Sequence, residues 1–131
     1  MKKNISHIFN IFLVFHLVIW TLIPFFSNTN LPRDVIEALA WGSNLEWGFE
    51  KHPPLSAFFL ETFFQIFGNQ DWAFYLLSQL FIVISFIVVF KLAKEFLKNE
   101  TYALISILLL EGIYFFNYTT PEFNVIVCQI P

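Results

Sequence analysis

Residues 8–26 read IFNIFLVFHLVIWTLIPFF, an apolar run that no charged residue interrupts. A transmembrane helix needs about 20 consecutive apolar residues, whereas the apolar part of a signal peptide takes only about 7–15. No small-x-small cleavage site follows the run, and Phe25-Phe26-Ser27-Asn28 is a poor candidate for one. The sequence therefore predicts an uncleaved first membrane span over about residues 8–26.

The composition of the chain also favours a membrane protein. Of its 131 residues, 57% are hydrophobic and 13% are charged, and the mean hydropathy is +0.66. Soluble domains are about 45–50% apolar and about 25% charged. The net charge is −3 and the basic residues are scattered, so nucleic acid is not an expected partner. The single cysteine, Cys128, cannot form an internal disulfide.

Two further apolar runs predict a second span over about residues 72–92 and a short third span over about 102–118. The outer loop between the first two spans covers residues 27–71. The expected fold class is all-α, a polytopic transmembrane helical bundle of about three spans, and residues 1–131 form one domain of it.

Two short juxtamembrane helices are predicted inside the outer loop. The first runs from Arg33 to about Trp47, after a cap at Asn30 or Thr29. The second begins at Pro53-Pro54, has apolar residues at helical spacing, and ends at Gly68-Asn69. Its polar residues on the other faces indicate a helix that lies at the membrane interface.

Basic residues predict the orientation of the chain. Lys2-Lys3 precedes the first span, and Lys91, Lys94 and Lys98 lie between the second and third spans. By the positive-inside rule both groups are cytoplasmic. The outer loop and the tail, residues 119–131, then share the opposite side of what we expect to be a bacterial inner membrane.

Two acids of the outer loop are spaced to share a helix face. Asp34, Glu37, Ala38 and Trp41 stand at i, i+3, i+4 and i+7. A carboxylate at a partly dry interface can act as a general base. The alternative is structural, because an acid in a first turn is stabilised by the helix dipole by about 0.3–1 kcal/mol. Spacing alone leaves both interpretations open.

A basic pair precedes the second loop helix in the stretch Lys51-His52-Pro53-Pro54-Leu55. Prolines place Lys51 and His52 near free backbone N–H groups at a helix N-terminus, where an anion such as phosphate can bind. The alternative is a solvated lysine and a histidine at a turn.

Together these motifs resemble the multi-spanning glycosyltransferases related to protein O-mannosyltransferases and to the lipid A aminoarabinose transferase. The resemblance rests on the loop acids, on the His-Pro-Pro-Leu step at His52, and on Thr120-Pro121-Glu122-Phe123-Asn124, which is similar to the family's acidic second outer loop. It covers nearly all of this chain, which would be the N-terminal part of a longer member and inactive alone.

The resemblance implies an enzyme that moves a sugar from a polyprenyl-phosphate carrier, in the membrane lipid, to a glycan, lipid or protein acceptor. It implies catalytic roles for Asp34, Glu37 and Glu122, and contacts from Lys51 and His52 to the donor phosphate. The chain departs from the family pattern in two ways. It has a glutamate, Glu122, in the second loop, and its two first-loop acids, Asp34 and Glu37, are not adjacent in the sequence.

Several alternatives stay open at this stage. No histidine, cysteine or acid cluster has metal-ligand spacing, so no cofactor is expected, although a divalent ion shared by Asp34 and Glu122 is conceivable. Glu111 inside the third span is either structural or functional. His16 in the first span favours helix–helix hydrogen bonding. The rival function is a small non-enzymatic membrane subunit or part of a transporter.

Overall fold

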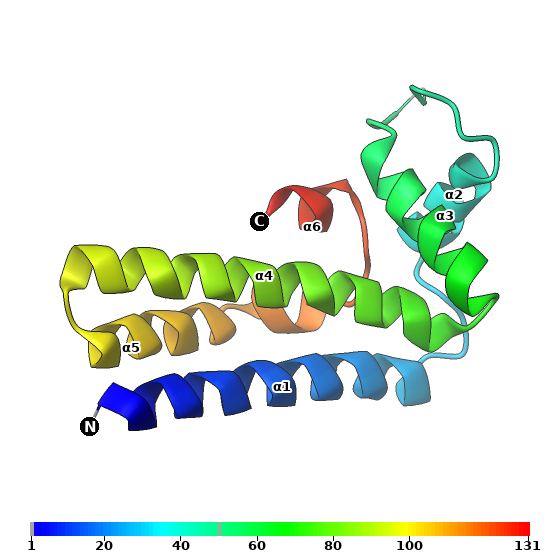
Figure 1. The fold of residues 1–131 in the computed structure, drawn as a ribbon. Coiled ribbons are helices and arrows are strands. Elements are labelled where there is room, and N and C mark those ends of the chain that lie inside the picture. Colours follow the sequence, from blue (N-terminus) through cyan, green and yellow to red (C-terminus); the bar gives the residue numbers. More distant parts are fainter. Residues whose placement is uncertain (1, 50) are drawn as a thin grey trace.

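The computed structural model describes residues 2–49 and 51–131, and the side chains of Lys2 and Lys3 are outside this description, as are Met1 and Glu50. The described chain is helical, and α1, α4 and α5 lie side by side in it (Figure 1). Its elements are α1 (Lys2–Ser27), α2 (Arg33–Gly42), α3 (Leu55–Phe67), α4 (Asp71–Leu97), α5 (Glu100–Glu111), the π-helical segment η1 (Phe115–Thr119) and α6 (Val125–Gln129).

Two helices have the length and hydropathy of membrane spans, Asn4–Ser27 within α1 and Asp71–Leu97, which is α4. They contain 24 and 27 residues, which at 1.5 Å per residue exceed the hydrocarbon thickness of about 30 Å. The predicted spans over 8–26 and 72–92 lie inside them. The two helices run antiparallel (Figure 1), and Phe9 stacks on Phe90 with ring centroids 4.0 Å apart.

The predicted third span over 102–118 is not confirmed as one continuous helix. Helix α5 has 12 residues, which give a length of only about 18 Å. It ends where Gly112 lowers helix propensity and where the Asn117 side chain donates a hydrogen bond of 2.6 Å to the Glu111 carbonyl. The chain then turns into η1.

The segment between α1 and α4 contains the two expected helices, with one boundary corrected. Helix α3 begins after Pro54 and ends at Gly68, which has a φ of 70°, as predicted. Helix α2 ends at Gly42 and does not reach Trp47. A Cβ on Gly42 would lie 2.7 Å from the Ala57 carbonyl oxygen, so the backbones of α2 and α3 meet there. The chain leaves the helix after this contact, with Leu45 at a φ of 49°.

The tail, residues 119–131, folds back towards α2 and α3. Helix α6 packs against α3 and α4, and it lies beside α4 near α3 in Figure 1. Phe123 and Val127 are 0% and 1% exposed, so these side chains anchor the tail in the core. The anchored tail brings Glu122 beside α2.

Candidate functional site

The loop and the tail meet at the start of α2. The backbone N–H of Asp34 donates to Oε1 of Glu122 at 3.1 Å, across 88 positions of sequence. The predicted cap at Asn30 or Thr29 is wrong, because Pro32 occupies the N-cap and makes no side-chain cap bond. The Glu122 carboxylate instead accepts one of the unpaired amides of the helix terminus, where negative charge is favoured.

A small cavity of about 90 Å³ lies along the face of α2 that carries Asp34 and Glu37. The four residues predicted to share that face all line it, together with His52 and residues of the tail. Its lining is Asp34, Glu37, Ala38, Trp41, His52, Ser56, Asn124, Val125 and Ile126. The structure thus places both loop acids and one of the two predicted basic residues around one space, and Glu122 reaches the same helix turn.

The predicted basic pair is divided between two environments. Nζ of Lys51 lies 2.6 Å from Oε1 of Glu37, and this lysine side chain is 57% exposed. The imidazole of His52 lies 5.7 Å, between ring centroids, from Trp41 at the cavity wall. Both residues precede α3, which begins at Leu55.

The Lys51 contact changes the acidity of Glu37. Its hydrogen bond lowers the pKa of the Glu37 carboxyl below the ordinary value; partial desolvation opposes this, and the positive charges of Lys51, Arg33 and His52 lower it further. Because the pKa is lowered in the folded protein, the ion pair is complete at neutral pH. It is lost as the pH falls through that lowered pKa.

We expect Lys51→Met to raise the pKa of Glu37 towards the value of an ordinary glutamate. The substitution removes both the hydrogen bond and the nearest positive charge. A ¹³C NMR titration of the side-chain carboxyl in detergent micelles measures the shift. Lys98→Met, at the end of α4, is the control and should leave the Glu37 titration unchanged. An unchanged Glu37 titration in Lys51→Met contradicts the contact.

A polar network connects α1, α4 and α5, and its central residue, His16, is buried. Nε2 of His16 lies 3.0 Å from Oε1 of Gln79 on α4, and Nδ1 lies 2.8 Å from Oε2 of Glu111 on α5. Trp20 donates its indole N–H to Oε1 of Glu111 at 3.1 Å. The prediction that His16 makes helix–helix hydrogen bonds is confirmed, and Glu111 has a structural partner.

The same network reaches the tail through Thr120. The hydroxyl of Ser78 donates to the Thr120 carbonyl, and the Gln79 amide lies 3.5 Å from the Thr120 hydroxyl. Thr120 is two positions before Glu122 and is 0% exposed. Sequence reasoning missed these residues, although the polar pair Ser78-Gln79 inside an apolar span was a signal that could have found them.

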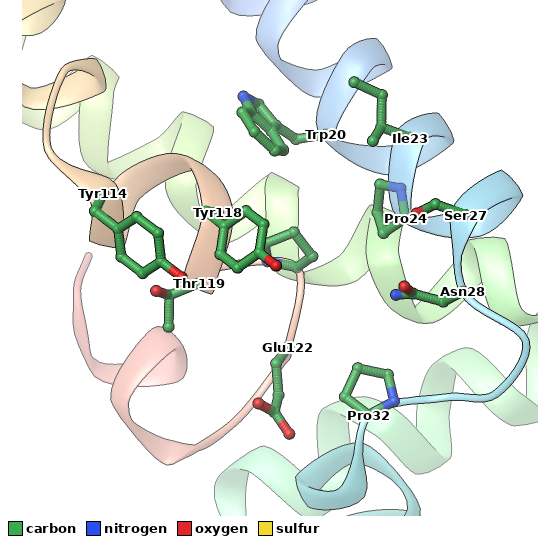
Figure 2. Close-up of a pocket in the computed structure, with 11 residues that line it drawn as sticks. Trp20, Ile23, Pro24, Ser27, Asn28, Pro32, Tyr114, Tyr118, Thr119 and Glu122 are labelled. Carbon is green, nitrogen blue, oxygen red and sulfur yellow. The ribbon is translucent and has the colours of Figure 1, made fainter.

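A larger cavity, of about 360 Å³, opens on the other side of Glu122. Figure 2 shows Trp20, Tyr114, Tyr118, Asn28 and Glu122 among the side chains around it. Its walls come from the end of α1, from the connection to α2, and from η1 with the start of the tail. Glu122 therefore lies between this cavity and the first turn of α2.

Metal ligands do not gather in the described part of the chain. Among residues 2–49 and 51–131, no group of three or more histidine, cysteine or acidic side chains could hold a metal ion. A divalent ion shared by two carboxylates alone stays a hypothesis from the sequence.

Comparison with known proteins identifies one family. The family model described as dolichyl-phosphate-mannose-protein mannosyltransferase matches residues 51–130, which is more than half of the chain. Curated proteins give no match, and solved structures give none either. The matched range contains Lys51, His52 and Glu122, and it begins after the α2 acids.

Proposed function

Since this chain belongs to the dolichyl-phosphate-mannose-protein mannosyltransferase family, we propose that it carries part of the active site of a membrane glycosyltransferase. The donor is a sugar on a polyprenyl-phosphate carrier, and the acceptor is a hydroxyl group of a lipid, glycan or protein. Two helices of spanning length support a site beside the bilayer, where the carrier can keep its apolar tail in lipid. Family membership favours this function over a non-enzymatic subunit.

One observation carries the proposal, which is the contact between Glu122 and the first turn of α2. It joins two acidic residues that lie 88 positions apart in the sequence, and Asp34 also lines the small cavity together with Glu37 and His52. An acid pair beside a basic side chain fits a reaction that takes a proton from one substrate and stabilises an anion on the other.

In the proposed reaction an acceptor hydroxyl oxygen attacks the anomeric carbon of the donor sugar. The bond between that carbon and the phosphate oxygen breaks, and polyprenyl phosphate leaves with the electron pair. The hydroxyl proton passes to the Asp34 carboxylate. Glu122 positions Asp34 through its backbone amide, and Glu37 adds negative charge beside it. The leaving group is already a phosphate, so the reaction needs no nucleotide.

Lys51 and His52 are proposed to meet the donor phosphate. His52 lies at the wall of the small cavity, and Lys51 is an exposed cation on the Glu37 side of it. The Lys51 ammonium can exchange its carboxylate partner for a phosphate oxygen when the donor binds, since both are anionic hydrogen-bond acceptors. Positive charge there stabilises the charge that grows on the leaving phosphate.

We place the site at the outer, periplasmic face of a bacterial inner membrane, with the N-terminus of the chain in the cytoplasm. Support comes from the basic residue Lys94, which lies at the opposite end of the long helices from the proposed site. Lys94 pairs with Glu100 at 2.6 Å near the turn from α4 to α5, whereas Asp34 lies with α2 at the other end of the spans (Figure 1). Basic residues mark the cytoplasmic end.

Sugar transfer by the natural gene product in membrane vesicles tests this function. We expect label to move from a radiolabelled mannosyl polyprenyl phosphate to an acceptor fraction, and none to move from a nucleotide sugar when carrier lipid is absent. A panel of polyprenyl-phosphate sugars then identifies the sugar. Vesicles that transfer none of these sugars, while the protein is present at normal abundance, contradict the proposal.

A further inference from the structure

The cavity beside Asp34 has a volume of about 90 Å³, well below the range of about 300–1,000 Å³ that is typical of small-molecule sites. The 360 Å³ cavity on the other side of Glu122 has the size of small-molecule sites, which begin at about 300 Å³. A sugar that reacts near Glu122 therefore needs the larger cavity.

Aromatic rings form much of this cavity's wall. The rings of Tyr114 and Tyr118 lie 4.9 Å apart and are inclined by 31°, and Trp20 stands at the opposite end from Glu122 in Figure 2. The face of an aromatic ring carries negative charge density. The C–H groups on one face of a pyranose carry partial positive charge and pack against such rings.

Polar groups of the same cavity suit the hydroxyl groups of a sugar. Asn28 lines the cavity, and its amide donates to the hydroxyl of the buried Tyr75 at 3.1 Å. The Asn28 side-chain oxygen remains an acceptor. Glu122 takes one hydrogen bond from the Asp34 amide, and a carboxylate has lone pairs for further donors. A few fixed polar groups among apolar walls are typical of a ligand site.

A chain of polar contacts holds Trp20, the largest ring of the wall, in place. The Trp20 indole N–H is fixed by Glu111 at 3.1 Å, and Glu111 is in turn 2.8 Å from His16, whose side chain is 0% exposed. A ring that is tied through its N–H cannot swing freely. Such support from behind is what keeps a binding group in a productive position.

We propose that this cavity binds the pyranose ring of a sugar substrate, with Trp20 as the stacking surface and Asn28 and Glu122 as ligands of the hydroxyl groups. The proposal rests on the proposed function, because it assumes that sugar transfer takes place next to Glu122. The ring can come from the donor or from a glycan acceptor, since both present the same chemistry. Glu111 and His16 are positioning residues for Trp20.

Binding measurements on the purified gene product test the proposal with three probes: mannosyl polyprenyl phosphate, polyprenyl phosphate without sugar, and methyl mannoside. We expect Trp20→Ala to weaken binding of a sugar-bearing probe by about tenfold, the size of a lost aromatic contact. Binding of the bare polyprenyl phosphate should not change. Trp20→Phe keeps a ring and should recover most of the affinity.

The matched control is Trp47→Ala, which removes a tryptophan that is 89% exposed and lies outside the cavity lining. A loss with mannosyl polyprenyl phosphate identifies the donor ring as the ligand, and a loss with methyl mannoside alone identifies the acceptor. Wild-type affinity of Trp20→Ala for both sugar probes, or an equal loss with the bare lipid phosphate, overturns the proposal. If the wild-type protein transfers no sugar, the proposed function fails instead.

Discussion

We expect Asp34→Asn to lower sugar transfer by about 100- to 10,000-fold, the usual contribution of a general base. Asparagine has nearly the same shape as aspartate and leaves the backbone amide that donates to Glu122 in place. It removes the basic carboxylate that is proposed to take the acceptor's proton. The rate of transfer from a labelled donor at saturating acceptor measures the effect, and the protein should remain at normal abundance in the membrane.

The structural interpretation of Asp34 makes a different prediction for the same variant. If the acid serves only the dipole of α2, its loss costs about 0.3–1 kcal/mol of stability and leaves turnover unchanged. Asp71→Asn is the matched control, because Asp71 is the acid in the first turn of α4 and lies away from both cavities. Equal turnover in the two variants would exclude Asp34 as the base.

We expect Glu111→Leu to lower the free energy of unfolding by about 2–4 kcal/mol, since each buried polar group left without a partner costs about 1–3 kcal/mol. The substitution takes an acceptor from Trp20 and a partner from the fully buried His16. The effect should exceed the average of about 0.6 kcal/mol for one interhelical hydrogen bond in a membrane. Unfolding of the gene product in mixed micelles measures it.

A double-mutant cycle separates the pair from its surroundings. His16→Leu combined with Glu111→Leu should cost less than the sum of the two single changes, because neither residue then leaves the other unpaired. Glu95→Leu, which removes an exposed acid from α4, is the control and should cost little. Additive losses in the cycle would show that His16 and Glu111 do not interact.

Local sequence signals predicted the parts of the fold that depend on neighbouring residues. The apolar run over residues 8–26 fixed the position of α1, because hydropathy over one span length is a local sum. The limits of α3 followed from Pro54 and Gly68, whose backbone preferences act at their own positions. Prediction failed for the end of α2, since the close approach of Gly42 to Ala57 is a contact between two helices.

The sequence suggested which residues belong to the candidate site, but it did not predict how they are arranged. The helical spacing from Asp34 to Trp41 predicted that four residues share one face, and all four line one cavity. The catalytic roles of Asp34 and Glu37 remain predictions. The pairing of Lys51 with Glu37 was not foreseen. Neither was the larger cavity around Trp20, whose walls come from both ends of the chain.

The sequence by itself indicated an all-helical chain with long apolar segments, a polar loop and a tail that carries Glu122, because hydropathy, charge and helix boundaries are properties of short segments. Only the tertiary structure decided that Glu122 reaches the first turn of α2 and that Glu111 meets His16 and Trp20. Those contacts join residues 88, 95 and 91 positions apart. Their geometry depends on how the helices and the tail pack against one another, which no local pattern specifies.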